Sequence, residues 1–291
     1  MKKIHLLLCI FIFCVFFINI SFAQTDNKAE SNIPISTRWV LNAVSETGRT
    51  TINSVYMIVC LKTSKKGTGF LIKTGQIITN EHVVRDCLVS EIYAYSSYRK
   101  KISFRQILLD EKRDLAILIP TEKIQGGLSL GSDDNLLVGK LVFTWGFPLG
   151  YNGPPPILSV GYLSGFKAYE KNNSGKDFIK HLVVNGAFNP GNSGGPLFIS
   201  DDDKVIGIVV SKHENISEDL LFKIEVLAKN RTGVGFTFID NEGNEKVLIE
   251  SQIVAELLQY FRDLTQVMIG EAISISELKA FLYENDIIWE N

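Results

Sequence analysis

The chain has 291 residues, of which 45% are hydrophobic and 21% are charged, and its formal net charge is −2. This composition is ordinary for a globular protein with one large domain or two modest ones. No run rich in Lys and Arg marks the sequence, so composition and charge disfavour nucleic acid and anionic membranes as partners.

The first residues carry the features of a secretory signal peptide. Lys2 and Lys3 precede an apolar run over 6–18, and the small residues Ser21 and Ala23 predict cleavage after Ala23. An uncleaved membrane anchor is the alternative, but this run is shorter than the roughly 20 residues that span a bilayer. We therefore expect a periplasmic or secreted protein with no stable membrane insertion after cleavage, and with a mature net charge near −4 because two lysines are removed.

Cleavage would leave two cysteines in the mature chain. Cys9 and Cys14 lie in the leader, whereas Cys60 and Cys87 follow it. Thiols tend to oxidise in exported proteins, which favours a single disulfide, and two buried free thiols are the alternative.

Residues 24–37 are polar and lack periodicity, so we expect a flexible linker there and a fold that begins near Arg38. Short apolar, β-branched segments then alternate with turns, which is the pattern of an all-β domain. Two sets of six such segments predict two six-stranded β-barrels, because closure removes exposed strand edges. The predicted strands are 54–61, 67–73, 76–80, 89–95, 102–109 and 114–120 in the first set, and 139–146, 157–165, 179–187, 195–200, 204–211 and 233–239 in the second.

The pattern changes after about Val247. Apolar residues recur at helical spacing over 253–264, and Ser274 with Glu277 has the spacing of a capping box at the start of a second helix. We therefore expect a β-barrel domain over 38–246 and a helical segment over 247–291. The apolar stripes of these helices are expected to pack on the domain, with partner binding as the alternative.

The segment "NPGNSGGPLF", residues 189–198, is too rich in glycine and proline for a helix interior or an ordinary strand. It is either a tight hairpin or a loop that presents Ser193. A serine nucleophile needs an imidazole base, a carboxylate that orients the base, and donors for the oxyanion. The rest of the chain decides between these two interpretations.

Three histidines follow the leader: His82, His181 and His213. His82 comes just after a predicted strand, where a loop can hold it at a cleft, whereas His181 lies within an alternating strand and His213 in a charged loop. Asp114 opens the predicted strand 114–120 and can orient a histidine. His82, Asp114 and Ser193 therefore form the candidate triad, with Gly191 shaping a turn whose N–H joins that of Ser193 in an oxyanion hole.

Eight collinear motifs extend this interpretation over residues 55–240: "GTGFLI", "ITNEHVV", "DLAIL", "GFPLG", "SVGYLSG", "NPGNSGGPLF", "VIGIVVS" and "GVGFTF". In order and spacing they resemble trypsin-like serine proteases of the HtrA/Deg type. The resemblance implies a chymotrypsin-like double β-barrel without cofactor or metal. It also implies that His82 is the general base, Asp114 its orienting acid and Ser193 the nucleophile, with Gly191, Asn192 and Ser193 forming the oxyanion hole.

The same resemblance carries three further expectations. A disulfide commonly occupies a place similar to that of Cys60 and Cys87 in chymotrypsin-like relatives. Members of the family usually carry PDZ domains and often form trimers, but only about 45 residues follow the last predicted strand, too few for a PDZ domain. The sequence leaves open whether the chain forms a homo-oligomer.

Specificity is predicted from the position six residues before the nucleophile, where trypsin-like enzymes that cut after Lys or Arg place an aspartate. This chain has Ala187 there, and a buried base would lack a counter-charge. Ile208, Val209 and Val210 are expected to complete an apolar pocket, and the backbone of their strand is expected to pair with substrate.

Together these patterns predict an exported serine endopeptidase that cleaves unfolded or extended polypeptides after small or aliphatic residues. The alternative is a catalytically weak or inactive protease-fold chaperone or peptide-binding protein. A purely structural protein would not explain the three catalytic residue types in three matching motifs.

Overall fold

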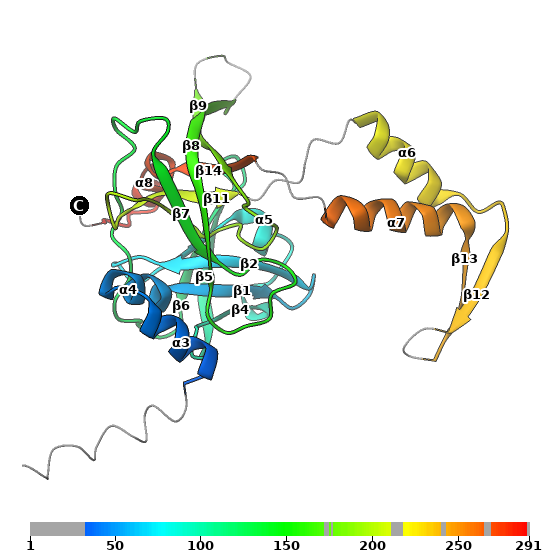
Figure 1. Cartoon of the computed structure of the whole chain (residues 1–291), viewed down its shortest axis with the longest axis horizontal. Helices are drawn as coiled ribbons and strands as arrows, with labels where there is room; N and C mark the ends of the chain where they lie inside the picture. Colours follow the sequence, from blue (N-terminus) through cyan, green and yellow to red (C-terminus); the bar gives the residue numbers. More distant parts are fainter. Residues whose placement is uncertain are drawn as a thin grey trace, which may run out of the picture.

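The structure of the chain is a computed structural model that describes residues 33–171, 175, 177–210, 218–239, 243–264 and 269–289. Two closed barrels of antiparallel strands lie side by side, and an arm of two helices and a hairpin projects from them (Figure 1). The predicted signal peptide, its cleavage site and most of the predicted linker lie outside the described residues. None of the described helices combines the length and apolar character needed to cross a membrane.

The first barrel has the strand order β1-β2-β3-β6-β5-β4, and all six strands lie where the sequence predicts them. Its strands are β1 (Val55–Cys60), β2 (Lys65–Leu71), β3 (Ile77–Thr79), β4 (Ile92–Tyr95), β5 (Lys101–Asp110) and β6 (Leu115–Pro120). Two short helices, α5 (Glu81–Val84) and η1 (Val89–Glu91), connect β3 to β4. Each strand is antiparallel to its neighbours, so the alternating apolar residues fill one closed interior.

The second barrel has the order β10-β11-β14-β9-β8-β7. Its strands are β7 (Leu141–Gly146), β8 (Ile157–Glu170), β9 (Phe178–Gly186), β10 (Pro196–Ile199), β11 (Val205–Val210) and β14 (Ile269–Ser274). The two barrels confirm the predicted all-β fold of the chymotrypsin-like type with C-terminal helices.

The sixth strand of the second barrel differs from the prediction. Residues 233–239 were expected to close the barrel, but β12 (Gly235–Ile239) pairs only with β13 (Glu245–Ile249) in a separate two-stranded sheet. The barrel is closed instead by β14, whose Val210↔Glu271 pairing joins it to β11. The segment 247–291, expected to be helical, therefore contributes a strand to the barrel.

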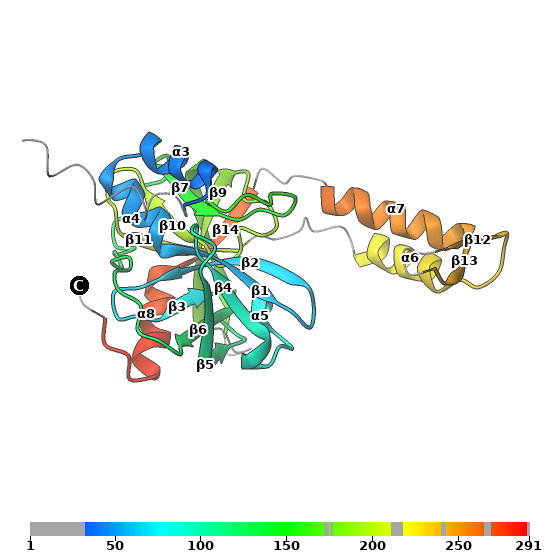
Figure 2. The same cartoon turned by 90° about the horizontal axis from the view of Figure 1, so that it is seen from below.

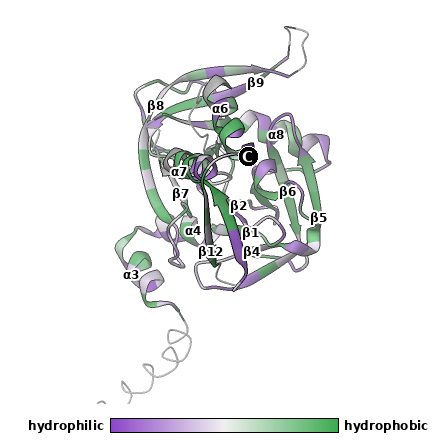
Figure 3. Ribbon diagram, turned by 90° about the vertical axis from the view of Figure 1, so that its right-hand side faces the viewer, coloured by the Kyte–Doolittle hydropathy of each residue, from purple (hydrophilic) through white to green (hydrophobic). Residues whose placement is uncertain are grey.

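The arm is formed by α6 (Glu218–Lys229), β12, β13 and α7 (Glu250–Leu264). It extends away from both barrels in two perpendicular views (Figures 1 and 2). In Figure 3 the arm faces the viewer and carries hydrophobic as well as hydrophilic residues. Large apolar side chains of the arm are exposed, among them Phe222, Phe236, Phe238, Ile239, Val247 and Leu257. Helix α7 confirms the predicted helix over 253–264.

Two helices that the sequence patterns did not predict precede the first barrel. They are α3 (Ile35–Ala43) and α4 (Glu46–Ser54), and the hydroxyl of Ser45 caps α4 by accepting from the Gly48 N–H at 3.2 Å. Thr37 is fully buried and donates to the Ser97 carbonyl at 2.7 Å. Residues 35–37, which the sequence analysis assigned to the linker, therefore belong to the fold.

The largest hydrophobic cluster lies between the barrels. Phe70 of β2 and Ile208 of β11 pack with Ile52 of α4, Phe147 and Phe281. Phe281 belongs to α8 (Ile275–Glu284), the second predicted C-terminal helix. Separate clusters fill each barrel interior. Because residues from both barrels share one core, the packing fixes the position of one barrel relative to the other.

Helix α8 begins after Ser274 as predicted, but not with the predicted capping box. The Ser274 hydroxyl donates to Asp133 Oδ2 at 2.6 Å, and Glu277 accepts from Arg113 Nε at 3.3 Å and from the Lys180 N–H at 3.1 Å. Both side chains that would cap the helix are therefore used to attach α8 to the barrels.

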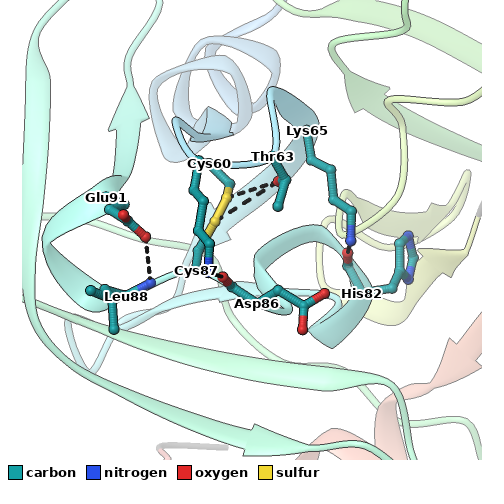
Figure 4. Close-up of a disulfide and its surroundings, with 9 residues drawn as sticks. Cys60, Thr63, Lys65, His82, Asp86, Cys87, Leu88 and Glu91 are labelled. Atoms are coloured by element: carbon teal, nitrogen blue, oxygen red, sulfur yellow. Dashed lines mark hydrogen bonds between the residues drawn. A yellow bond between two sulfur atoms is a disulfide. The ribbon is translucent and has the colours of Figure 1, made fainter.

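The structure joins Cys60 and Cys87 in the predicted disulfide. Cys60 ends β1, Cys87 follows α5, and their Cα atoms are 6.2 Å apart. Figure 4 shows the bridge close to the turn of helix that carries His82. The bridge therefore ties the segment after His82 to the first barrel.

Candidate active site

His82 lies on the single turn of α5, directly after β3. Pairing of Thr79 with Ala116 brings the end of β3 beside the start of β6, where Asp114 lies. Asn80 Nδ2 and the Glu81 N–H both donate to the Asp114 carbonyl, at 2.9 and 3.2 Å. The strand pairing and these hydrogen bonds therefore hold residues 79–81 against residues 114–116 without any contribution from the triad side chains.

The imidazole and the carboxylate are in direct contact. His82 Nδ1 lies 2.8 Å from Asp114 Oδ2 and 3.0 Å from Oδ1, and the His82 N–H donates to Oδ1 at 3.0 Å. Asp114 has a φ of 56°, a left-handed conformation that an aspartate adopts more readily than most residues. A carboxylate at Nδ1 favours the tautomer with the proton on Nδ1, which leaves Nε2 as a base.

Ser193 lies on a loop whose glycines permit very close backbone approach. Gly191 has a φ of 95°, and a Cβ atom there would lie 2.5 Å from the Phe147 carbonyl oxygen. Gly194 has a φ of 86°, and its Cβ would lie 2.1 Å from the Thr68 carbonyl oxygen. Any side chain at these two positions would push the loop out of place, which explains the glycines in this motif.

Thr68, from the "GTGFLI" motif on β2, holds this loop. Its backbone N–H donates to the Ser193 carbonyl at 2.8 Å, and its hydroxyl donates to the Gly191 carbonyl at 2.7 Å. The same hydroxyl accepts from the Phe147 N–H at 3.0 Å. A residue of the first barrel thus fixes the nucleophile loop of the second, a role that the sequence analysis did not assign.

The backbone hydrogen bonds of the loop decide which of the predicted oxyanion donors are available. The Pro190 carbonyl accepts from the Leu149 N–H at 2.7 Å, so the trans peptide directs the Gly191 N–H to the opposite side. The Asn192 N–H donates to the Asn189 carbonyl at 3.0 Å and is used within the turn. The inclusion of Asn192 among the donors was therefore wrong, and Gly191 and Ser193 are the remaining candidates.

A cavity of about 330 Å³ joins the candidate residues. It is lined by His82, Val83, Leu149, Pro190, Gly191 and Ser193, together with residues 64–66 of the first barrel. The base and the nucleophile therefore face the same space. Leu149 belongs to the "GFPLG" motif and is 57% exposed, and the only sequence signal for this wall of the cavity was a leucine in a glycine-proline segment.

The predicted pocket residues lie elsewhere. Ile208 and Val209 are fully buried in the hydrophobic cores, and Val210 is buried beside them. The Val209 N–H donates to Gly195, and its carbonyl accepts from Gly194, so this part of β11 has no edge left for substrate. The assignment of Ile208 and Val209 as pocket walls was wrong, because both barrel faces of β11 are covered. Ala187 is half-buried after β9 and does not line the cavity.

His181 does not join the site. His181 is buried on β9, and its Nδ1 lies 3.0 Å from Glu271 Oε2 of β14. His213 lies outside the described residues. In the described part of the chain, no group of three or more His, Cys, Asp and Glu side chains is arranged to hold a metal ion.

Comparison with known sequences agrees with this geometry. Residues 67–208 match the family of trypsin-like peptidase domains. A "Probable periplasmic serine endoprotease DegP-like" of Pseudomonas fulva is 36% identical over 143 residues, which cover 49% of this chain and 28% of the relative. A protein of the same name from Chlamydia pneumoniae is 35% identical over 148 residues, covering 50% of this chain and 29% of the relative. The match thus spans less than a third of the length of these relatives.

Solved structures share the fold. The Rv3671c protease in its inactive form has a TM-score of 0.53 at 18% identity, over 82% of this chain and 92% of that one. The HtrA-type protease AlgW with a tripeptide has a TM-score of 0.52 at 19% identity, over 83% of this chain and 62% of that one. These likenesses show the double-barrel fold, and the chemistry of the site depends on the residues described above.

Proposed function

We propose that this chain, whose residues 67–208 form a trypsin-like peptidase domain similar to those of DegP-like serine endoproteases, is itself a serine endopeptidase. The observation that carries the proposal is the contact between His82 Nδ1 and Asp114 Oδ2, at 2.8 Å, beside a cavity that Ser193 also lines. A hydrogen-bonded pair of this kind leaves the other ring nitrogen of His82 available as a base for a nucleophile that lines the same cavity.

The reaction follows from these positions. His82 Nε2 accepts the proton of the Ser193 hydroxyl while Oγ attacks the scissile carbonyl, and Asp114 stabilises the resulting imidazolium. The N–H groups of Gly191 and Ser193 stabilise the oxyanion. The imidazolium then donates its proton to the leaving amine, and water repeats the sequence to release the acyl group.

The substrate is an unfolded or extended polypeptide, cut after small or aliphatic residues. Val83, Leu149 and Pro190 give the cavity apolar walls, and none of its lining residues is a carboxylate that could receive a basic side chain. These features support the predicted specificity, although Ala187, Ile208 and Val209 do not line the cavity.

We further propose that the protein acts after export, in the periplasm or outside the cell. The features of residues 1–23 and the printed names of the periplasmic relatives support this location. Assembly into a homo-oligomer is part of the same proposal, since it rests on the resemblance to HtrA/Deg proteases.

Incubation of the chain with unfolded casein tests the activity, with Ser193→Ala as the matched control. The substitution is expected to lower hydrolysis by about 10⁴ or more, because the triad acts as a unit. Asp114→Asn is expected to remain folded and to lose most activity, because the tautomer of His82 changes. Cleavage at equal rates by the Ser193→Ala chain would refute the serine mechanism.

A folded wild-type chain that cleaves nothing would favour the alternative, a peptide-binding protein with a protease fold. Light scattering of an aggregating client protein then measures whether the chain binds unfolded polypeptides without cutting them. Equal suppression by the wild type and by Ser193→Ala would assign the function to binding.

A further inference from the structure

Two lysines of β2 border the cavity that holds His82 and Ser193. Lys65 is exposed and its Nζ donates to the His82 carbonyl at 3.3 Å, a contact visible in Figure 4. Lys66 is half-buried, and its Nζ donates to the Tyr151 carbonyl at 2.6 Å and to the Pro148 carbonyl at 3.4 Å. Both ammonium groups are therefore held near the cavity by neutral carbonyl oxygens.

Neither lysine is neutralised by a carboxylate. Within the described residues, the ion pairs involve other basic side chains, and no carboxylate lies within 4.0 Å of the Lys65 or Lys66 ammonium group. Burial lowers the pKa of Lys66, which is the direction expected for an ammonium group without an opposite charge beside it. Two uncompensated positive charges next to one cavity favour an anionic group in the ligand.

The position of the lysines selects one side of the scissile bond. His82 must reach the leaving amine to protonate it, so the polypeptide after the scissile bond leaves on the histidine side of Ser193. Lys65 donates to the His82 carbonyl, and Lys66 lines the same cavity as His82.

We propose that Lys65 and Lys66 form a subsite for an acidic side chain at the first or second position after the scissile bond, an inference that rests on the proposed endopeptidase function. A glutamate or aspartate there would accept hydrogen bonds from ammonium groups that now have only carbonyl partners. Ammonium groups bind a carboxylate as mobile point charges, so the subsite selects charge more than shape.

The test compares quenched fluorescent peptides that are identical except for Glu or Gln at these two positions, each with an amidated C-terminus. The measured quantity is the ratio of kcat/KM for the Glu peptide to that for the Gln peptide. We expect a ratio of about five to ten in the wild type, falling toward one in Lys65→Gln/Lys66→Gln and in about 1 M salt, which screens charges beyond roughly 3 Å. Lys65→Arg is expected to keep most of the preference.

Two controls keep the result interpretable. Lys73→Gln removes an exposed lysine two residues beyond the opposite end of β2 and is expected to keep the wild-type ratio. Lys65→Gln alone leaves the contacts of Lys66 with Pro148 and Tyr151 intact, so it lowers the ratio without disturbing that loop. A ratio of one in the wild type, or an unchanged ratio in the double variant, would overturn the proposal.

Binding to the Ser193→Ala chain separates this inference from the proposed function. Fluorescence polarisation with the same peptides needs no hydrolysis, and tighter binding of the Glu peptide that is lost in Ser193→Ala/Lys65→Gln supports the subsite. If the wild type cleaves casein but Ser193→Ala binds both peptides equally, the subsite alone is refuted. A chain that prefers the Glu peptide but cleaves nothing refutes the endopeptidase alone.

Discussion

The Thr68 hydroxyl donates to the Gly191 carbonyl at 2.7 Å, across 123 residues of sequence and from one barrel to the other. Thr68→Val keeps the shape of the side chain but leaves the Gly191 carbonyl and the Phe147 N–H without this partner. Each buried polar group that loses its partner costs about 1–3 kcal/mol. With two such groups, we expect the free energy of unfolding to fall by at least about 2 kcal/mol, measured by urea denaturation.

The activity of Thr68→Val is expected to fall at least tenfold with little change in KM, because the oxyanion donors are displaced more than the substrate contacts. Thr68→Ser keeps the hydroxyl and is the matched control, with activity expected near that of the wild type. Equal loss in both variants would assign the effect to packing instead of the hydrogen bond.

Arg113 joins the turn before Asp114 to the C-terminal helix. The guanidinium is buried and bonds to Glu284 through two nitrogens, at 2.8 and 2.6 Å, and to Glu277 at 3.3 Å. The hydrogen bond to Glu284 raises the pKa of Arg113, although burial opposes it. Arg113→Met leaves several carboxylates without their counter-charge, so we expect a loss of about 3 kcal/mol in thermal or urea unfolding.

Glu284→Gln is the graded comparison for Arg113→Met. The Glu284 side chain is 50% exposed, so solvent screens its contribution, and we expect a loss below about 1 kcal/mol. If Glu284→Gln proved as damaging as Arg113→Met, the buried part of the network would not be what stabilises the turn.

The sequence predicted eleven of the twelve barrel strands, because most of them alternate apolar residues between clear turns. Residues 233–239 have the same pattern, yet β12 is exposed along its length and pairs only within the arm. The true sixth strand, β14, contains Glu271 and Ser274, which made it look polar. Glu271 is buried there because His181, Tyr169 and Lys167 bond to it.

The candidate triad was predictable because each residue lies in a local motif with its own turn or strand end. The contacts of Thr68 with Gly191 and Ser193 were not, because they connect residues more than 120 positions apart. Ile208 and Val209 were misplaced for a related reason. Apolar residues on a strand fit a pocket or a core equally well, and only the neighbouring strands decide between them.

Loss of the Cys60–Cys87 bridge is expected to destabilise the chain without removing the candidate site. The bridge closes a loop of 27 residues, for which chain entropy predicts about 3 to 4 kcal/mol as an upper value. Cys60→Ala/Cys87→Ala is expected to show a lower melting temperature and to retain measurable activity. Intact-mass analysis after alkylation without reductant gives the control, since two reactive thiols in the denatured wild type would contradict the bridge.

Asp133 predicts a component of acid sensitivity. Burial alone would raise the pKa of Asp133, but hydrogen bonds from Ser274, Lys180 and Ser276 outweigh it and hold the pKa below its usual value. A group with a depressed folded pKa contributes stability above its unfolded pKa, about 3.9, and loses it as pH falls through the folded value. The stability difference between the wild type and Asp133→Asn should thus be constant near neutral pH and shrink below about pH 4.

Urea unfolding at several pH values measures this difference. Asp134→Asn is the matched control, because it removes one negative charge from the same loop and leaves Asp133 and its hydrogen bonds in place. A difference that stays constant down to pH 2 would contradict the assignment.

The arm is expected to be dispensable for the barrels, because β11 and β14 are already neighbours. Val210 pairs with Glu271 in an antiparallel register, so the two strands need only a short hairpin turn between them. We expect a chain in which Asn-Gly replaces residues 213–268 to fold with a melting temperature within a few degrees of the wild type. Far-UV circular dichroism should show less helix, because α6 and α7 are removed.

Truncation after Ser274 gives the opposite result and serves as the control for this deletion. It removes fewer residues than the arm contains, but Leu278, Phe281 and Leu282 of α8 are buried in the core shared by both barrels. Losing three such side chains costs several kcal/mol, which is comparable to the whole stability of a domain. The truncated chain should therefore lack a cooperative thermal transition. Loss of that transition in the chain without the arm would instead show that the arm stabilises the barrels, despite its exposed apolar residues.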